Sequence, residues 1–188
     1  MTVTTTTSDL TALSGTYTID PAHSRIGFIA RHAMVTKVRG AFNDFEGSVV
    51  LDGDNPANST ARVTIKAGSI DTRNGQRDEH LRNNDFLDVA SYPEITFVST
   101  GVRQTGDTDF ELTGDLTIKG VTNSVTIPFT YEGSATDPFG NLRVGFEGAL
   151  AILRSDWGLT WNAALETGGW LISDRIQIEF DVSAIRAG

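Results

Sequence analysis

Apolar and polar residues alternate along most of the chain after residue 15, which is the pattern of strands with one buried face. In residues 60–67 every second side chain is apolar, and Arg62, Thr64 and Lys66 lie between the apolar positions. The same period recurs at 110–119, 125–131, 144–152 and 176–182, and in shorter form near 17–19, 26–30, 38–42, 49–51 and 95–97. About eight to ten strands are therefore expected.

Strands with one apolar and one charged face are typical of antiparallel sheets that bury a single face. Turn residues separate the runs, as at Asp52-Gly53 and Lys119-Gly120. Glycines also fall inside the runs, where they mark bulges or bends of a closing sheet. They are Gly40, Gly47, Gly114, Gly145 and Gly148. The pattern favours an all-β antiparallel barrel, with a two-sheet sandwich as the alternative.

One segment, from Asp71 to Pro93, interrupts the alternation. Its composition is helical, either Asp71 or Asn74 could cap the start of a helix, and Pro93 excludes a helix beyond it. We predict a helix over about Gln76–Val89 that covers an open end of the barrel, with Phe86 in its apolar stripe.

The chain has 188 residues, the size of one ordinary domain. Residues 1–15 are rich in threonine and contain no Lys or Arg, so they are expected to form a flexible tail and not a secretory signal. The folded domain is then expected over residues 16–188, with a cytoplasmic location. Because no run of about 18 apolar residues occurs, no transmembrane segment is expected.

Charge and cysteine content narrow the function further. Lys and Arg number 15 against 24 Asp and Glu, which gives a net charge of −9. Such a surface repels phosphate backbones and anionic lipid surfaces, so neither nucleic acid nor a peripheral membrane surface is an expected partner. The absence of cysteine excludes disulfides, Cys-ligated metals and thiol catalysis.

Candidate catalytic and metal-binding groups are sparse. The histidines are His23, His32 and His80, and none of them forms the i, i+4 pair of a helical zinc site. His23 and Ser24 are strand neighbours, so their side chains point to opposite faces and cannot pair. Neither a Gly-x-Ser-x-Gly elbow nor a phosphate-binding Gly-x-x-x-x-Gly-Lys loop is present. We predict no catalytic residue, no metal and no cofactor.

Aromatic residues occupy the apolar faces of separate predicted strands, which taken singly is the pattern of a packed core. A barrel of about eight strands, however, either fills with side chains or holds one small ligand. Gly40, Gly114 and Gly148 share a face with apolar neighbours, where a filled barrel would need a side chain. These glycines favour an apolar cavity.

Several motifs occur in a fixed order along the chain. They are Tyr17-x-Ile19-Asp20-x-x-His23-Ser24, Phe28-x-x-Arg31-His32, Gly40-x-Phe42-x-x-Phe45-x-Gly47, Ser69-Ile70-Asp71-Thr72, Arg77-Asp78-x-His80-Leu81-x-x-x-Asp85-Phe86-Leu87-Asp88, Tyr92-Pro93-x-Ile95-x-Phe97-x-Ser99-Thr100, Gly114-Asp115-Leu116-Thr117-Ile118-x-Gly120-Val121-Thr122 and Arg154-Ser155-Asp156-Trp157-Gly158. Over about residues 16–185 the chain thereby resembles the YceI-like family of polyisoprenoid-binding, lipocalin-like proteins.

The resemblance implies an extended, lipocalin-like antiparallel barrel of about eight strands with a helical insertion and a long apolar pocket. It also implies a hydrophobic, isoprenoid-like small molecule as the ligand, such as a polyisoprenoid or an isoprenoid quinone, and a possible homodimer. Family members are often periplasmic or secreted, and the chain departs from them in lacking a signal. A carrier or storage role is the favoured interpretation. The alternative is an enzyme, or an enzyme accessory, that uses His80 or His32 as a general base on a bound lipid.

Candidate ligand-binding residues follow from the shared face of each strand. Those expected to line the interior are Phe28, Phe42, Val63, Ile65, Leu116, Ile118, Phe129, Phe146, Ile178 and Phe180, with Phe86 on the helical cover. An apolar wall cannot satisfy a polar head group, so His32, His80 and Arg154 are the candidates to hold it. For Arg154, pinning a loop against a neighbouring carboxylate is an equally good interpretation.

Overall fold

The structure of the protein is a computed structural model that describes residues 10–187 except 167 and 170. Its strands are β1 (Gly15–Ile19), β2 (Arg25–His32), β3 (Thr36–Phe42), β4 (Phe45–Leu51), β5 (Thr60–Lys66), β6 (Ile70–Asp71), β7 (Glu94–Gln104), β8 (Asp109–Ile118), β9 (Val121–Thr136), β10 (Leu142–Leu153) and β11 (Arg175–Arg186). The helical elements between the strands are α2 (Gly75–Arg82) and the 3₁₀ turns η1 (Pro21–His23), η2 (Pro56–Asn58), η3 (Ala67–Ser69) and η4 (Arg154–Trp157). Leu10 and Thr11, at the start of the described residues, are helical as well.

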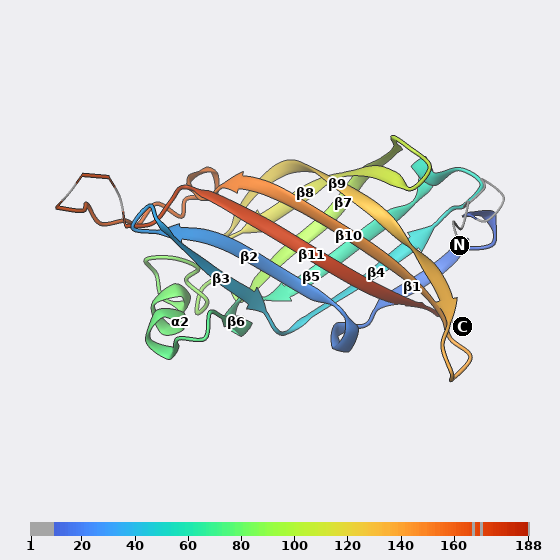
Figure 1. The fold of residues 1–188 in the computed structure, drawn as a ribbon, viewed down its shortest axis with the longest axis horizontal. Coiled ribbons are helices and arrows are strands. Elements are labelled where there is room, and N and C mark those ends of the chain that lie inside the picture. Colours follow the sequence, from blue (N-terminus) through green and yellow to red (C-terminus); the bar gives the residue numbers. More distant parts are fainter. Residues whose placement is uncertain (1–9, 167, 170, 188) are drawn as a thin grey trace.

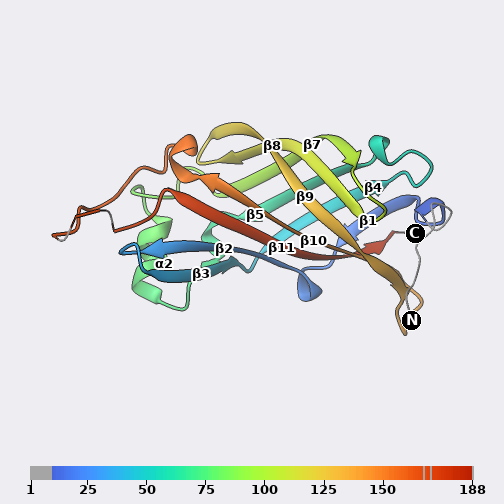
Figure 2. The same cartoon turned by 45° about the horizontal axis from the view of Figure 1, so that its top comes forward.

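The strands form one antiparallel sheet that closes into a barrel (Figures 1 and 2). Hydrogen-bonded neighbours follow the order β1-β4-β5-β7-β8-β9-β10-β11, and β1 pairs with β11 to complete a ring of eight. After the turn η1, β2 pairs with the part of β11 that β1 does not reach. The chain then turns back as β3, which pairs with β2, before it continues into β4. The predicted barrel is confirmed, and closure excludes the sandwich.

Side chains of the predicted inner face do point inward. Val63 and Ile65 line the interior, opposite Phe97 and Ile95 on β7. Thr64 lies between them on the strand, and its side chain therefore points to the outer face. The alternation of apolar and polar residues thus sets the register of the wall, because a shift by one residue would turn every apolar side chain outward.

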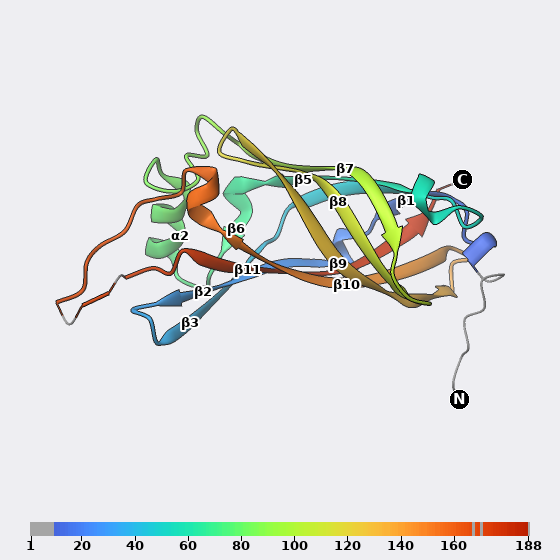
Figure 3. The same ribbon diagram turned by 90° about the horizontal axis from the view of Figure 1, so that it is seen from above.

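The helical insertion is shorter than expected. Asn74 caps the start of α2, because its Oδ1 accepts a hydrogen bond from the backbone N–H of Arg77 at 3.0 Å. The helix ends at Arg82 and not at Val89, since Asn83 adopts an extended backbone (ψ −179°) and its Oδ1 accepts from the N–H of Asp85 instead. The following residues form turns, and the helix lies at one end of the barrel beside β6 (Figures 1 and 3).

The two ends of the barrel differ in what they carry. At one end lie the start of β1, the end of β11 and the loop after β4, and we call it the terminal end (Figure 1). At the other end lie α2, the β2–β3 hairpin and the loop between β10 and β11, and we call it the helix end (Figure 3). The cavity described next belongs to the terminal half of the barrel.

Candidate functional site

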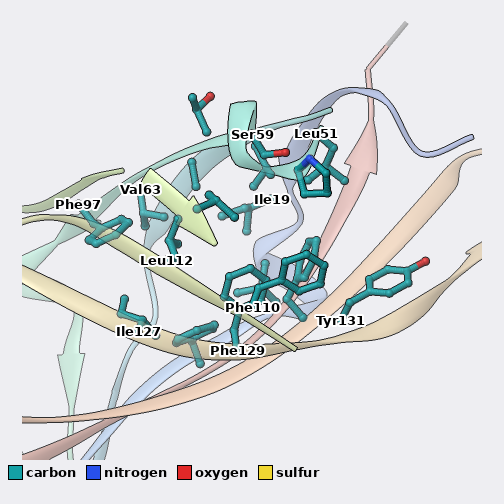
Figure 4. Close-up of a pocket in the computed structure, with 18 of the residues that line it drawn as sticks. Ile19, Leu51, Ser59, Val63, Phe97, Phe110, Leu112, Ile127, Phe129 and Tyr131 are labelled. Carbon is teal, nitrogen blue, oxygen red and sulfur yellow. The ribbon is translucent and has the colours of Figure 1, made fainter. Parts of the chain in front are cut away.

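An apolar cavity of about 210 Å³ occupies the barrel interior (Figure 4). Side chains of β1, β2, β4, β5, β7, β8, β9, β10 and β11 line it, so every strand of the ring contributes. The strand residues of the lining are Ile19, Ile26, Val49, Leu51, Thr60, Ala61, Val63, Ile65, Phe97, Val102, Phe110, Leu112, Leu116, Ile127, Phe129, Tyr131, Phe146, Leu150, Ile178, Phe180 and Val182. A surface of this kind can bind a hydrocarbon chain and offers it no chemistry.

Seven of the predicted wall residues line this cavity. They are Val63, Ile65, Leu116, Phe129, Phe146, Ile178 and Phe180. Each lies on the inner face that the alternation predicts, and their contact with a ligand stays a prediction.

Four other predicted residues do not line the cavity, because they lie nearer the helix end. Ile118 is buried in the core there, at 7% exposure. Phe28 and Phe42 pack against each other, with ring centroids 5.8 Å apart, and against the same core. Phe86 is buried in the turn after α2 and packs on His80, with centroids 5.0 Å apart.

Aromatic rings cover the inward glycines, so the volume these glycines release is filled. A Cβ at Gly148 would lie 2.3 Å from the Cζ of Phe180, and one at Gly40 would lie 2.3 Å from the Cζ of Phe28. The sequence predicted that these glycines favour a cavity. In the structure the space beside them is occupied by aromatic rings, so the glycines do not themselves mark empty space. Where the covering ring is Phe180, it lies close to the wall and still borders the cavity.

The three predicted head-group residues are all at the helix end, away from the cavity. His32 forms an isolated antiparallel β-bridge with Ile172 through the backbone. The Nε2 of His80 lies 2.9 Å from the Oδ2 of Asp85, and the His80 ring packs edge-on to Trp161 with centroids 4.7 Å apart. Neither histidine is a lining residue of the cavity.

Arg154 is buried and fixes the loop between β10 and β11. Its Nε donates to the carbonyl of Ser173 at 3.0 Å, and its Nη1 donates to the carbonyls of Leu159 at 2.6 Å and Trp161 at 3.0 Å. Burial lowers the pKa of the Arg154 guanidinium from its ordinary value. Arg154 therefore pins a loop, as one of the two interpretations held, although its partners are backbone carbonyls and not a carboxylate.

The helix end of the barrel is filled by side chains. Trp157 of η4 is 3% exposed, and its Nε1 donates to the carbonyl of Leu116 at 2.9 Å. Leu87, Ile95 and Leu159 are buried in the same cluster. The cavity therefore ends near Ile65 and Leu116 and does not run through the barrel.

The sequence did not predict the part played by the N-terminal segment. Leu10 and Leu13, expected in a flexible tail, are 8% and 7% exposed and line the cavity. The segment is held by the hydroxyl of Tyr17, which donates to the carbonyl of Leu13 at 2.8 Å, and by Ser14 Oγ, which accepts from the N–H of Gly53. The remaining tail, residues 1–9, lies outside the described residues. Two leucines three apart in a threonine-rich stretch were the available signal.

Polar groups meet the cavity only at its terminal end. Asp52, Ser59 and Thr60 form what we call the rim, and Ser59 lies beside Leu51 in Figure 4. Thr60 is exposed, so the lining reaches the surface there. The backbone N–H of Asn55 and the side-chain amide of Asn58 hold the pKa of Asp52 below its ordinary value.

Neither a metal cluster nor a membrane-spanning helix occurs in the described part of the chain. Within residues 10–187 apart from 167 and 170, no three His, Cys, Asp or Glu side chains gather as metal ligands would. In the same residues, no helix has the length and apolar character needed to cross a bilayer.

Comparison with known proteins agrees with the architecture. A family model described as the YceI-like domain matches residues 17–184. A UPF0312 protein of Azotobacter vinelandii is 39% identical over 150 residues, which is 79% of this chain and 78% of that protein.

Two solved structures share the fold. BcnA of Burkholderia cenocepacia superposes with a TM-score of 0.76 at 29% identity, over 88% of this chain and 98% of that one. A Saccharophagus degradans domain, described as polyisoprenoid-binding and implicated in plant cell wall breakdown, superposes with a TM-score of 0.69. Its identity is 14%, over 91% of this chain and 98% of that domain, so it supports the fold alone.

Proposed function

The chain belongs to the YceI-like family, and from this premise we propose that it binds the hydrophobic chain of a polyisoprenoid, isoprenoid quinone or similar amphiphile inside the barrel, as a carrier or store. The observation that carries the proposal is the cavity, whose wall is built of Val, Leu, Ile and Phe from almost every strand. Burial of such a chain contributes roughly 25 cal/mol for each Å² removed from water.

A long ligand needs more room than the cavity offers. Its volume of about 210 Å³ is below the roughly 300–1,000 Å³ of ordinary ligand pockets. Leu10 and Leu13 occupy the terminal end of this space and belong to the segment that precedes the first strand. We infer that a bound chain displaces these two leucines, extending the cavity toward the rim.

Native mass spectrometry of the purified protein, followed by organic extraction, tests the proposal directly. The expected result is an added mass that extraction removes and that chromatography identifies as a lipid with a hydrocarbon chain. Protein that carries no lipid and also fails to bind a prenyl alcohol added in solution would contradict the proposal.

A matched pair of substitutions places the ligand in the cavity. Ala61→Trp puts an indole into the lumen, because Ala61 lines the cavity, whereas the neighbouring Arg62 points to the outer face of β5. We expect Ala61→Trp to reduce bound lipid at least several-fold and Arg62→Trp to leave it as in the unmodified protein. Equal lipid content in the two variants, with both folded by circular dichroism, would put the ligand elsewhere.

Three companion expectations stay predictions. Recovery of unaltered lipid after prolonged incubation would support a protein that performs no chemistry on its ligand. Sedimentation velocity would measure whether the chain forms a homodimer. Fractionation of cells that express it natively would measure the predicted cytoplasmic location.

A further inference from the structure

The rim of the cavity has a marked charge character. Among the described residues that line the cavity, none is Lys, Arg or His, and the one charged side chain is Asp52. Residues 1–9, which precede the segment at the rim, contain Asp9 and no Lys or Arg in sequence. A head group at the rim would therefore lie near the loop that carries this carboxylate and near no basic side chain of the lining.

Asp52 is held as a carboxylate by the loop that follows β4. Its Oδ1 accepts hydrogen bonds from the N–H groups of Asp54 and Asn55, at 3.1 and 3.0 Å, and its Oδ2 accepts from Asn58 Nδ2 at 3.2 Å. These bonds favour the ionised form, which is why the pKa of Asp52 lies below its ordinary value. The rim is therefore negative at neutral pH.

Three arginines near this end have partners of their own. Arg103 Nη2 donates to Glu111 at 2.7 Å, and Arg143 donates to Asp20 and Asp137 at 2.8 and 2.9 Å. Arg186 Nη1 donates to the carbonyl of Ala12 at 3.2 Å. None of these arginines lines the cavity, and Arg62 points to the outer face of β5.

One hydroxyl group completes the rim. Ser59 Oγ accepts from the N–H of Asp52 at 3.0 Å, which leaves its own O–H free to donate to a ligand. Thr60 shares the outer face of β5 with Arg62, so its hydroxyl points away from the lumen. The Ser59 donor matches a carbonyl or hydroxyl oxygen, which is the polar end of a neutral amphiphile.

Given the proposed function, on which this inference rests, we propose that the cavity selects hydrocarbon chains with an uncharged, hydrogen-bonding head group and discriminates against phosphate and carboxylate head groups at its rim. The selection acts through repulsion: an anionic head near the Asp52 carboxylate is repelled by it, and the hydroxyl of Ser59 does not neutralise the charge. The free O–H of the same Ser59 satisfies a neutral head, which would otherwise be buried unpaired.

A pair of probes that share one chain tests the selection. Geranylgeraniol and geranylgeranyl phosphate differ only in the head, so the ratio of their dissociation constants isolates it. We expect the alcohol to bind at least about tenfold more tightly in low salt, and the ratio to shrink as ionic strength rises.

Two variants locate the selection on the rim. Asp52→Asn removes the rim carboxylate and should narrow the ratio several-fold, chiefly by tighter binding of the phosphate. Asp54→Asn removes an equal charge from an exposed position in the same loop that does not line the cavity, and should narrow the ratio much less. Thermal denaturation of each variant confirms that the loop still folds.

Each result decides a separate statement. If the phosphate binds as tightly as the alcohol, or Asp52→Asn leaves the ratio unchanged, the head-group selection is overturned while lipid binding stands. If neither probe binds the unmodified protein, lipid binding itself is overturned, and the selection with it.

Discussion

The terminal and helix ends of the barrel are built from the same alternating strands but have opposite interiors. At the terminal end the inner faces of β4, β5 and β7 carry small or medium side chains, such as Val49, Ala61 and Val102, and enclose the cavity. At the helix end the space is filled by Trp157 and by Leu87, which come from segments between the strands. Whether this barrel is hollow therefore depends on its connections and less on its wall.

Charge is also unevenly distributed. The β2–β3 hairpin at the helix end carries Arg31, Lys37 and Arg39, and residues 21–43 contain no Asp or Glu. The rim at the terminal end carries a carboxylate and no basic lining residue. A net charge of −9 thus coexists with a basic hairpin at the end of the barrel opposite the rim.

Removing a side chain that fills the helix end should have the largest effect on the difference between the two ends of the barrel. Trp157→Ala deletes a buried indole and removes the hydrogen bond that its Nε1 donates to the carbonyl of Leu116. We expect the free energy of unfolding to fall by about 3–5 kcal/mol. Urea denaturation measures the loss, and Leu153→Ala, at a side chain that is 47% exposed, is the control. A loss no larger than that of the control would show that the helix end is not packed as described.

A methyl group beneath an aromatic ring should have the next largest effect. In Gly148→Ala the new Cβ would meet the Cζ of Phe180 and, at 2.7 Å, the carbonyl oxygen of Pro128. We expect about 1–3 kcal/mol of destabilisation and a ring of Phe180 pushed into the lumen, which lowers the amount of lipid bound.

Gly145→Ala on the same strand is its matched control. There the nearest atom to a Cβ is 3.6 Å away, an ordinary contact. If the two alanine variants have the same stability and bind lipid equally, ring packing over Gly148 does not shape the cavity.

The N-terminal segment should affect ligand affinity. Leu10 and Leu13 are buried in the cavity that the lipid would occupy, so in the ligand-free protein they compete with it. In a Leu10→Ser, Leu13→Ser variant we expect a fluorescent prenyl lipid to bind about tenfold more tightly, since each buried leucine contributes roughly 1.5–3 kcal/mol and only part of that opposes binding. Fluorescence titration measures the dissociation constant. Thr11→Ala, at an exposed position between them, should leave the constant unchanged, and a double variant that binds the lipid no more tightly than the unmodified protein would refute the displacement of these leucines.

Acid should weaken the terminal end slightly and leave the hydrogen bonds of Arg154 unaffected. The N–H of Asn141 and the Arg143 guanidinium lower the pKa of Asp137 from 3.8 to about 2, and Arg143 likewise lowers the pKa of Asp20. A lowered pKa means that these carboxylates stabilise the fold above pH about 4 and lose that contribution as pH falls toward 2. The partners of Arg154 are carbonyls, which do not titrate in this range.

Melting temperatures between pH 5 and pH 2 check this expectation. The unmodified protein should lose stability more steeply over that interval than Asp137→Asn, which has already lost the titrating group. Identical slopes would exclude a role for the contact between Arg143 and Asp137.

The wall could be predicted from the sequence, and the contents of the barrel could not. Alternation decides the direction of each side chain, so Val63 and Phe180 were placed correctly on the inner face. It carries no information on packing across the barrel. Ile118 was therefore expected in the cavity, although the side chains that fill the helix end bury it. The partners of polar groups were harder still to predict. Arg154 binds backbone carbonyls of residues up to 19 positions away, and every residue has such a carbonyl whatever its side chain.

Loop and terminal segments gave the other differences. The helix was predicted to reach Val89 because composition gives no sign of the single extended residue, Asn83, at which it ends. The leucines of the N-terminal segment were assigned to a tail because a lone pair in a polar stretch has too little periodicity to predict burial.

The chain enters and leaves the barrel at the same end, since β1 pairs with the last residues of β11 and the N–H of Ala187 donates to the carbonyl of Thr16. Any label attached to the described residues just before β1 or just after β11 is therefore held at the same end as the rim, while the helix end lies opposite. A fluorophore on either of these segments would report events at the rim. Immobilisation that keeps the rim accessible requires an attachment point at the helix end, such as the exposed tip of the β2–β3 hairpin at Val35.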